Sequence, residues 1–378
     1  MIDFGLTDDQ GALQTAAREF LTTECTPTLV RETAGTADGV PRTLYAGMAE
    51  LGWMGILVPE RDGGLGMGTL DLALVLEEMG RVAAPGPFLS TQLVIAALVR
   101  AGTAEQRATW LPRLVAGEAF GALAYLEDGD RHDPAGIQTK AQRTKGGYTL
   151  SGTKLFVLEG PGADVLLVAA RTKAGNGPAG VSLFLVERGA KGLRTRSQES
   201  LDLSRRVGEV VLRNVTVPRE ALLGKEGCGW PLLSRLLDLA AVGIAADSLG
   251  GAHRALTMAV EYTQIREQFG RKIGSFQSIK HIAAEMVADV EPSRSLVWWA
   301  AYAQDRPGVD GARGAAMAKA SLGDVFSRTA RHAVEIHGGI GFTWEHDLHL
   351  WFKRAHMSEL LFGDPPFHRD RLAALDGY

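Results

Sequence analysis

The periodicity of apolar residues changes twice along the chain, and this change limits the folds it can adopt more than any other feature. Up to residue 118, and again from residue 229, apolar residues recur at three- and four-residue intervals, as in helices that bury one face. Between these regions lie short runs rich in Val, Leu and Phe, separated by Gly, Asn, Pro and Lys: Tyr148 to Gly152, Val165 to Ala170, Val181 to Glu187 and Glu209 to Val217. The chain is therefore expected to be α+β.

Both helical regions divide into several helices. The expected helices of the first region are Asp8 to Leu21, Arg42 to Leu51, Thr69 to Gly80, Ser90 to Ala101 and Ala104 to Val115. Those of the last region are longer: Leu232 to Arg266, Phe276 to Asp305, Ala312 to Ile336 and Trp344 to Phe362. Long helices joined by short turns favour an antiparallel bundle. We therefore predict an N-terminal helical domain over residues 1–118, a middle β-barrel-like domain over 119–228 and a C-terminal antiparallel four-helix bundle over 229–378.

Composition and charge exclude several classes of protein. The formal net charge of −4 leaves no basic excess for a nucleic-acid backbone, so no nucleic-acid partner is expected. Met1 to Phe20 lack a basic segment followed by an apolar one, and the apolar run Leu93 to Val99 is too short to cross a bilayer. The two cysteines, Cys25 and Cys228, make no disulfide framework. We expect a cytoplasmic protein with no membrane contact.

Two motifs in the last third are the most informative parts of the chain. Arg266 to Gly270 form an R-x-x-F-G turn, and Phe276 to His281 follow with F-Q-x-I-K-H at an expected helix start. Further on, His337 to Glu345 carry the glycine-rich run H-G-G-I-G-F-T-W-E. Taken singly, Arg266 would be interpreted as a solvated cation at a helix end, and Gly338-Gly339 as a helix stop before a turn. The ordered combination is far more specific than either motif alone.

In this order, the two motifs resemble the flavin-binding signature of acyl-CoA dehydrogenases. The succession of helical, β and helical regions resembles the same family over nearly the whole chain. The run from Gly338 to Asp347 resembles a branch that includes enzymes of sterol side-chain breakdown and subunits of hetero-oligomers. The resemblance implies FAD as cofactor, an acyl-CoA thioester as substrate and α,β-desaturation as the reaction. It also implies an electron-transfer flavoprotein or a similar acceptor as partner.

The resemblance further implies which residues contact FAD. The Arg266 guanidinium would bind the diphosphate through paired charge-assisted hydrogen bonds, Phe269 would meet the adenine, and Gln277 would bond a ring atom or a ribose hydroxyl. Gly338 and Gly339 would let the backbone approach the cofactor, because they have no Cβ. The other implied contacts are Glu335, near the adenine end, and Leu126 and Phe156 on the β domain.

The reaction needs a general base to take the α proton, and the resemblance implies two positions for it. One follows the last bundle helix, where this chain has Phe362; the other lies on the helix before the R-x-x-F-G turn, where it has Ala240. Neither side chain accepts a proton. Asp364 and Asp247 are the remaining catalytic candidates, but Asp364 is equally expected as a turn or cap residue and Asp247 as the partner of a bundle arginine. The backbone N–H of Phe362 still offers a donor for a thioester oxygen.

The β-domain motifs have also lost polar residues. The family's T-E-P-x-x-G-S-D turn matches Leu126 to Asp133, with Leu126 and His132 in place of Thr and Ser, and its W-I-T segment matches Phe156 to Leu158. Two donors to the flavin ring are therefore expected to be missing. In the family, the R-x-x-F-G arginine and the glycine loop reach a neighbouring subunit's flavin. Two hypotheses follow: an FAD-dependent enzyme that assembles as a dimer of dimers, or a non-catalytic subunit that completes the FAD site of a homologous partner.

No metal site is expected. His332 and His337 are five residues apart and do not share a helix face, whereas His346 and His349 could share one but lack a nearby cysteine or pair of carboxylates. The sequence has no G-x-S-x-G elbow and no Walker loop, so it does not favour a hydrolase or a nucleoside triphosphatase.

Overall fold

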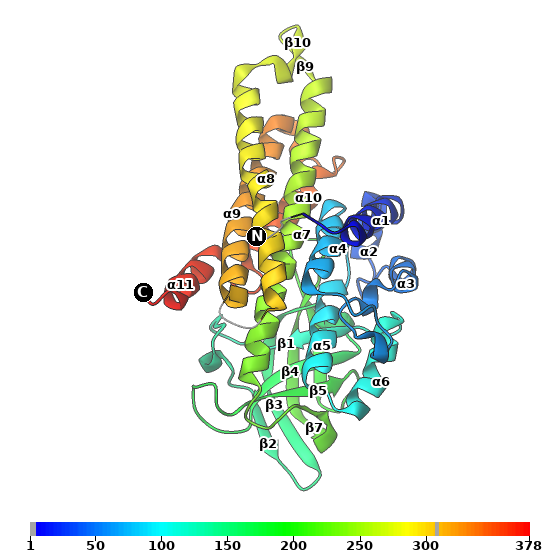
Figure 1. Ribbon diagram of the computed structural model, residues 1–378, viewed down its shortest axis with the longest axis vertical. Coiled ribbons are helices and arrows are strands. Elements are labelled where there is room, and N and C mark those ends of the chain that lie inside the picture. Colours follow the sequence, from blue (N-terminus) through cyan, green and yellow to red (C-terminus); the bar gives the residue numbers. More distant parts are fainter. Residues whose placement is uncertain (1–4, 307–309) are drawn as a thin grey trace.

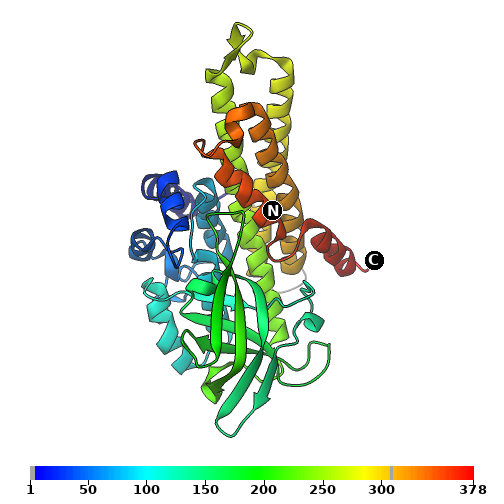
Figure 2. The same ribbon diagram turned by 180° about the vertical axis from the view of Figure 1, so that it is seen from behind.

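The computed structural model describes residues 5–306 and 310–378. A long helical bundle stands on one end of a twisted sheet, and shorter helices cover the flank where the two meet (Figures 1 and 2). The sheet separates two apolar cores: in β4 (Val165–Arg171), Leu167 and Ala169 belong to the core shared with the helices, whereas Leu166 and Val168 belong to the other. The predicted α+β class, with sheet between two helical regions, is confirmed.

The N-terminal region consists of helices, some of which begin at a threonine whose side chain caps the helix. Its helices are α1 (Asp8–Glu24), α2 (Pro27–Ala34), α3 (Arg42–Glu50), α4 (Thr69–Arg81), α5 (Phe88–Ala101) and α6 (Ala104–Val115). At the start of α1, the Thr7 hydroxyl accepts a hydrogen bond from the Gln10 N–H and the Gln10 side chain accepts one from the Thr7 N–H. The sequence analysis missed α2, which has eight residues and is too short for clear periodicity. Its Thr26 cap and Pro27 at the first helical position were the available signals.

The middle region is one open sheet. Its strands are β1 (Gly121–Ala124), β2 (Lys140–Arg143), β3 (Gly147–Leu158), β4, β5 (Val181–Glu187), β6 (Leu193–Gln198), β7 (Val207–Pro218) and β8 (Leu222–Leu223). They pair in the order β6-β7-β3-β2-β4-β5-β8, and β1 pairs with β4 in parallel. Within the described residues, the end strands β6 and β8 do not pair with each other, so the barrel-like form predicted for this domain is corrected to an open sheet.

Strand β3 bends at two irregularities that shape the neighbouring cavity. Its register with β7 shifts between Leu150 and Gly152 and again between Lys154 and Val157. Phe156 lies inside the second shift with φ +51°, a left-handed conformation that is uncommon for a side chain of this size. Its N–H donates to the side chain of Gln198 on β6 (3.0 Å), and its ring is 51% exposed. The bulge therefore turns an apolar side chain outward at the end of the strand.

The last third forms the predicted antiparallel bundle. Its long helices are α7 (Trp230–Ile265), α8 (Gln277–Gln304) and α9 (Asp310–His337), and α10 (Leu348–Leu360) packs against α7 and α9. The two-residue strands β9 (Glu267–Gln268) and β10 (Arg271–Lys272) form a hairpin between α7 and α8, at the end of the bundle away from the sheet (Figure 1). A final helix, α11 (Pro365–Leu375), was not expected from the sequence. Across the part of the chain that the structure describes, no helix has the length and apolarity to span a membrane.

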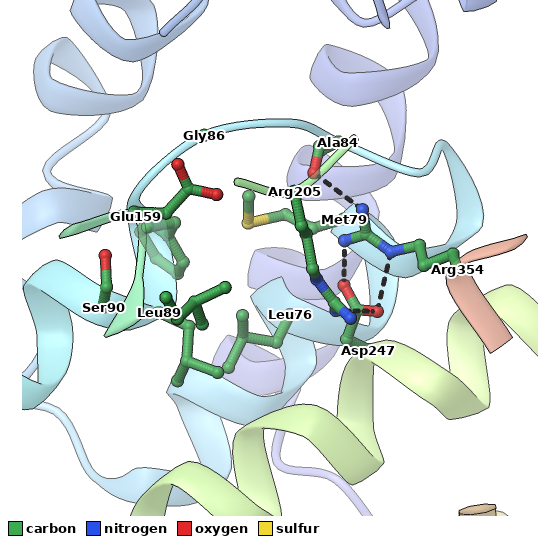
Figure 3. A pocket seen from close by; sticks show the side chains of 12 residues that line it. Leu76, Met79, Ala84, Gly86, Leu89, Ser90, Glu159, Arg205, Asp247 and Arg354 are labelled. Atoms are coloured by element: carbon green, nitrogen blue, oxygen red, sulfur yellow. Dashed lines mark hydrogen bonds and ion pairs between the residues drawn. The ribbon is translucent and has the colours of Figure 1, made fainter. Parts of the chain in front are cut away.

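A buried ion cluster joins these regions. The carboxylate of Asp247 on α7 accepts hydrogen bonds from Arg205, in the β6–β7 connection (2.6 Å), and from two nitrogens of Arg354 on α10 (2.9 and 2.5 Å; Figure 3). Arg354 also donates to the carbonyl of Ala84, between α4 and α5 (3.1 Å), and Arg205 donates to the hydroxyl of Ser358 (2.6 Å). Burial disfavours the charge of Asp247, but Arg205 and Arg354 outweigh that effect and lower its pKa.

We predict that Asp247→Asn destabilises the protein by about 3–5 kcal/mol, because it leaves two buried guanidinium groups without their counter-charge. Urea unfolding at pH 7 would measure the free energy of unfolding. The matched control is Asp324→Asn, which removes a half-exposed partner of Arg369 and should cost less than about 1 kcal/mol. Equal effects of the two substitutions would contradict the importance of the buried cluster.

Candidate functional site

A cavity of about 610 Å³ lies between the sheet and the connection from α10 to α11. The end of β1, the loop after it and the end of β3 form one wall; the last turn of α10 and the following loop form the other. The cavity brings together four residues that the sequence analysis selected: Leu126, Phe156, Phe362 and Asp364. Most of its lining is apolar, so it can exclude water from a bound ligand.

Phe362 lies at the first position expected for the base, in a loop whose backbone carbonyls are hydrogen-bonded by buried side chains. It has φ +58°, again a left-handed conformation for a bulky residue. The buried ammonium of Lys319 on α9 donates to the carbonyls of Glu359 (2.9 Å) and Gly363 (2.7 Å), and the His368 ring contacts the carbonyl of Phe362 (3.0 Å). Within the described residues, the N–H of Phe362 has no hydrogen-bond partner. These contacts fix the shape of the loop and leave the N–H of Phe362 available as a donor, although the Phe362 side chain cannot accept a proton.

The two groups that hold this loop are buried, and burial changes their protonation. Burial lowers the pKa of Lys319 to about 7, against the opposing attraction of Asp364 and Glu359. Burial, with a smaller effect of Lys319, lowers the pKa of His368 to about 3. The His368 ring is therefore neutral at pH 7, so its Nε2–H is the donor to the Phe362 carbonyl.

The structure gives the carboxylate candidates other partners. Asp364 caps α11, where its side chain accepts a hydrogen bond from the N–H of Phe367 (2.8 Å). Asp247 lies in the ion cluster, where both oxygens are engaged, and it does not line the 610 Å³ cavity. Ala240, at the second expected base position, is fully buried in α7. We therefore assign the proton acceptor to none of these three residues.

The wall formed by the sheet is apolar where the family resemblance implied hydroxyl donors. Leu126 and Leu158 are both buried and line the cavity, and the carbonyl of Leu126 is already bonded to the N–H of Leu155 (2.9 Å). Two polar residues line the same wall: Tyr125, which was not expected from the sequence, and His132, which stands in place of the Ser of the family's turn. Tyr125 directly precedes the matched turn, so its place in the sequence was the one available signal.

The other predicted cofactor residues lie at the opposite end of the bundle from the sheet (Figures 1 and 2). Phe269, in the β9–β10 hairpin, is 91% exposed, and within the described residues the exposed Arg266 guanidinium makes no hydrogen bond or ion pair. Gln277 begins α8 and Glu335 pairs with His332 near the end of α9 (2.9 Å). At Gly338 and Gly339 an added Cβ would meet no atom within 4 Å.

Each of these two groups of residues offers features that suit one part of a flavin dinucleotide. The exposed group offers what a diphosphate and an adenine require: a free guanidinium, an exposed ring and open glycine backbone. The cavity offers an apolar slot beside the loop of Phe362. The hairpin and the sheet, and with them the two groups of residues, lie at opposite ends of the bundle (Figure 1).

Comparison with known proteins identifies the family. Models of the acyl-CoA dehydrogenase N-terminal, middle and C-terminal domains match residues 7–118, 122–215 and 227–375. The acryloyl-CoA reductase (NADH) of Anaerotignum propionicum is 33% identical over 374 residues, which cover 97% of this chain and 94% of the relative. The chain belongs to the acyl-CoA dehydrogenase family.

Solved structures agree with this assignment. The butyryl-CoA dehydrogenase of Megasphaera elsdenii superposes with a TM-score of 0.90 at 30% identity, covering 99% of both chains. A structure titled "PigA with FAD and proline" superposes with a TM-score of 0.91 at 26% identity, covering 100% of this chain and 99% of that one. This chain is similar to both over its whole length.

We predict that His368 makes stability pH-dependent. Its pKa is about 3 in the folded protein and about 6.5 when unfolded, so the unfolded chain binds the extra proton between these values. Stability contributed by the neutral ring is therefore complete above pH 6.5 and falls as pH decreases, by about 1.4 kcal/mol per unit. The stability difference between wild type and His368→Gln should thus shrink between pH 7.5 and 5.5. A difference that stays constant over this range would contradict the prediction.

Proposed function

We propose that this chain is an FAD-binding acyl-CoA dehydrogenase that converts the Cα–Cβ single bond of an acyl-CoA thioester into a double bond, within an oligomer whose flavin sites are shared between chains. The observation that carries the proposal is the apolar 610 Å³ cavity beside the free N–H of Phe362. That N–H would donate to the thioester oxygen as negative charge develops there, which is the stabilisation this reaction requires. When bound, FAD would accept the β hydrogen as hydride.

The oligomer follows from the distribution of the cofactor residues. Arg266, Phe269, Gln277, Glu335, Gly338 and Gly339 would bind the FAD of an adjoining chain, whereas Leu126 and Phe156 would flank the flavin ring in their own chain. The free charge and exposed ring at the bundle's end support this arrangement, because an exposed aromatic ring and an unpaired cation are what a partner or cofactor covers. The adjoining chain is a second copy or a homologous partner, and we propose a dimer of dimers in the cytoplasm. An electron-transfer flavoprotein or similar acceptor would reoxidise the flavin.

A second candidate is a non-catalytic subunit that completes the flavin site of a homologous partner. Phe362 and Ala240 occupy both positions at which the family places its base, and Asp247 and Asp364 are engaged elsewhere. In this case the chain would contribute its exposed residues to the partner's site and leave its own cavity without turnover. In that case, the activity implied by the resemblance to the sterol side-chain branch would belong to the complex of this chain with its partner.

The visible spectrum of the purified chain separates the two candidates. We predict a yellow protein whose flavin absorbance falls when a saturated acyl-CoA is added without oxygen, because hydride transfer reduces the flavin. A series of acyl-CoA thioesters of increasing chain length would supply the probes. A colourless chain that becomes part of a yellow complex only with a homologous partner would favour the non-catalytic subunit.

We predict that Arg266→Ala weakens FAD retention in the assembled protein by about 1.5–3 kcal/mol, which corresponds to about 10- to 150-fold in dissociation constant. The reason is the loss of a charge-assisted contact to the diphosphate. Flavin fluorescence released during dialysis would measure the effect. Arg61→Ala removes another exposed arginine, in the N-terminal region, and should leave retention unchanged. Unchanged retention in Arg266→Ala would make Arg266 a surface cation only.

A further inference from the structure

Two polar side chains in the cavity wall form a hydrogen-bonded pair beside Phe362. The hydroxyl oxygen of Tyr125 lies 2.9 Å from Nδ1 of His132, and the Tyr125 ring stacks on the Phe362 ring, with centroids 6.1 Å apart and planes 9° apart. Both residues line the 610 Å³ cavity. The carbonyl of Tyr125 accepts a hydrogen bond from the buried ammonium of Lys154 (3.1 Å), which fixes the backbone that carries the phenol. The pair thus lies next to the residue that replaces the family's base.

His132 connects this phenol to an exposed carboxylate. Its Nε2 lies 3.6 Å from Oδ1 of Asp130, whose side chain is 81% exposed, whereas the His132 side chain is only 7% exposed. The ring of Phe367 packs against His132 with centroids 4.9 Å apart and limits its rotation. Carboxylate, imidazole and phenol therefore form a line from solvent to the cavity, in which each member can hold or pass a proton.

The surroundings select one tautomer of His132. The carboxylate of Asp130 favours a proton on Nε2, so Nδ1 keeps its lone pair and the Tyr125 hydroxyl is the donor. Burial lowers the pKa of His132; Asp130, Asp364 and Asp133 raise it, and Lys319 lowers it. The ring is therefore neutral at pH 7, which is the state that can accept a proton. Burial raises the pKa of Tyr125, so the phenol stays protonated at rest and transmits a proton rather than storing one.

We propose that Tyr125 and His132 together replace the missing carboxylate as the acceptor of the substrate's α proton. The inference rests on the proposed function. The Cα–H bond breaks and its proton bonds to the Tyr125 oxygen, while the phenolic O–H breaks and its proton moves to Nδ1 of His132. The electron pair left on Cα would form the Cα–Cβ double bond, and the β hydrogen would leave with its own pair to the FAD that the proposed function names as hydride acceptor. The imidazolium that forms faces Asp130 and returns its Nε2 proton to solvent.

A structural hydrogen bond in a closed core is the competing interpretation. Against it, both side chains border a cavity of ligand size, and the line of proton-carrying groups ends in solvent at Asp130. A hydrogen bond that served packing alone would need neither the exposed carboxylate nor the open cavity. The two interpretations predict different results for Tyr125→Phe, which removes only the phenolic oxygen.

The first experiment needs no cofactor or turnover. The C2 proton of His132 is followed by NMR from pH 4 to 8 in wild type, Tyr125→Phe and Asp130→Asn. Losing the phenolic donor should raise the pKa of His132 and losing the carboxylate should lower it, because the first supports the neutral ring and the second supports the charged one. His368, Lys319, Asp133 and Asp364 also face or influence this ring, and none of them changes in these variants. If the pKa of His132 is the same in both variants as in wild type, the proposal that Tyr125 and His132 act as a proton acceptor is wrong.

The second experiment measures proton removal separately from oxidation. The assembled holoprotein is incubated in D2O with a 3-thia-acyl-CoA, which can lose an α proton but has sulfur instead of a β carbon and so no hydride to give. Tyr125→Phe and His132→Gln should slow exchange of the α hydrogens about 100-fold or more, the usual contribution of acid–base catalysis. The matched control is Tyr148→Phe, which loses a comparable hydrogen bond to Glu226 (2.7 Å) outside the cavity and should stay within about twofold of wild type.

Binding of FAD and of the analogue, measured by absorbance and by isothermal titration, separates the possible failures. If both variants bind flavin and the analogue and still exchange within about threefold of wild type, Tyr125 and His132 are not the proton acceptor. The proposed function would remain in place. Wild type that binds both ligands yet exchanges no α hydrogen also overturns the pair. Wild type that binds neither flavin nor thioester overturns the proposed function itself.

Discussion

The carboxylate of Asp247 is the point on which the arrangement of the three regions depends. It accepts hydrogen bonds from Arg205, which belongs to the sheet region, and from Arg354, which belongs to α10; Arg354 in turn holds the carbonyl of Ala84 from the N-terminal helices. Two buried guanidinium groups without their counter-charge would be strongly unfavourable, so sheet and bundle are kept together at this distance. Figure 3 shows the two arginines around the Asp247 carboxylate, and the 610 Å³ cavity lies between the same two regions, the sheet and the end of α10.

The loop after α10 shows what the chain has kept of the family's site and what it has lost. Lys319 and His368 hold the carbonyls around Phe362, and the left-handed backbone is maintained with a phenylalanine in place of a carboxylate. Features carried by the main chain, such as a free N–H, survive any change of side chain. Features carried by side chains do not, and Phe362, Ala240, Leu126 and Leu158 have neither a carboxylate nor a hydroxyl. Tyr125, which is hydrogen-bonded to His132, stacks on the Phe362 ring.

The two ends of the molecule are complementary and neither is complete. The hairpin end has exposed groups suited to a diphosphate and an adenine, while the sheet end has a mostly apolar cavity. The bundle separates the two ends, and this is why the proposed function includes an oligomer in which a second chain would complete each site (Figure 1). A shared site also allows one chain to lose catalytic groups while its partner keeps them, which gives the non-catalytic subunit its physical basis.

Periodicity in the sequence was sufficient to predict the α+β class and the long helices of the bundle, and the ordered motifs at Arg266 and Gly338 were sufficient to predict the family. These are local signals, since each depends on residues within a few turns or on a contiguous pattern. The exposed strand β6 has no alternation to detect, and β1, β2, β8 and α2 are too short to show a period. Whether the sheet closes, which arginines pair with Asp247, and that Tyr125 meets His132 and Phe362 were decided by the tertiary structure. Each of these depends on the relative positions of separate elements, which follow from packing and strand pairing across the whole chain rather than from any local pattern.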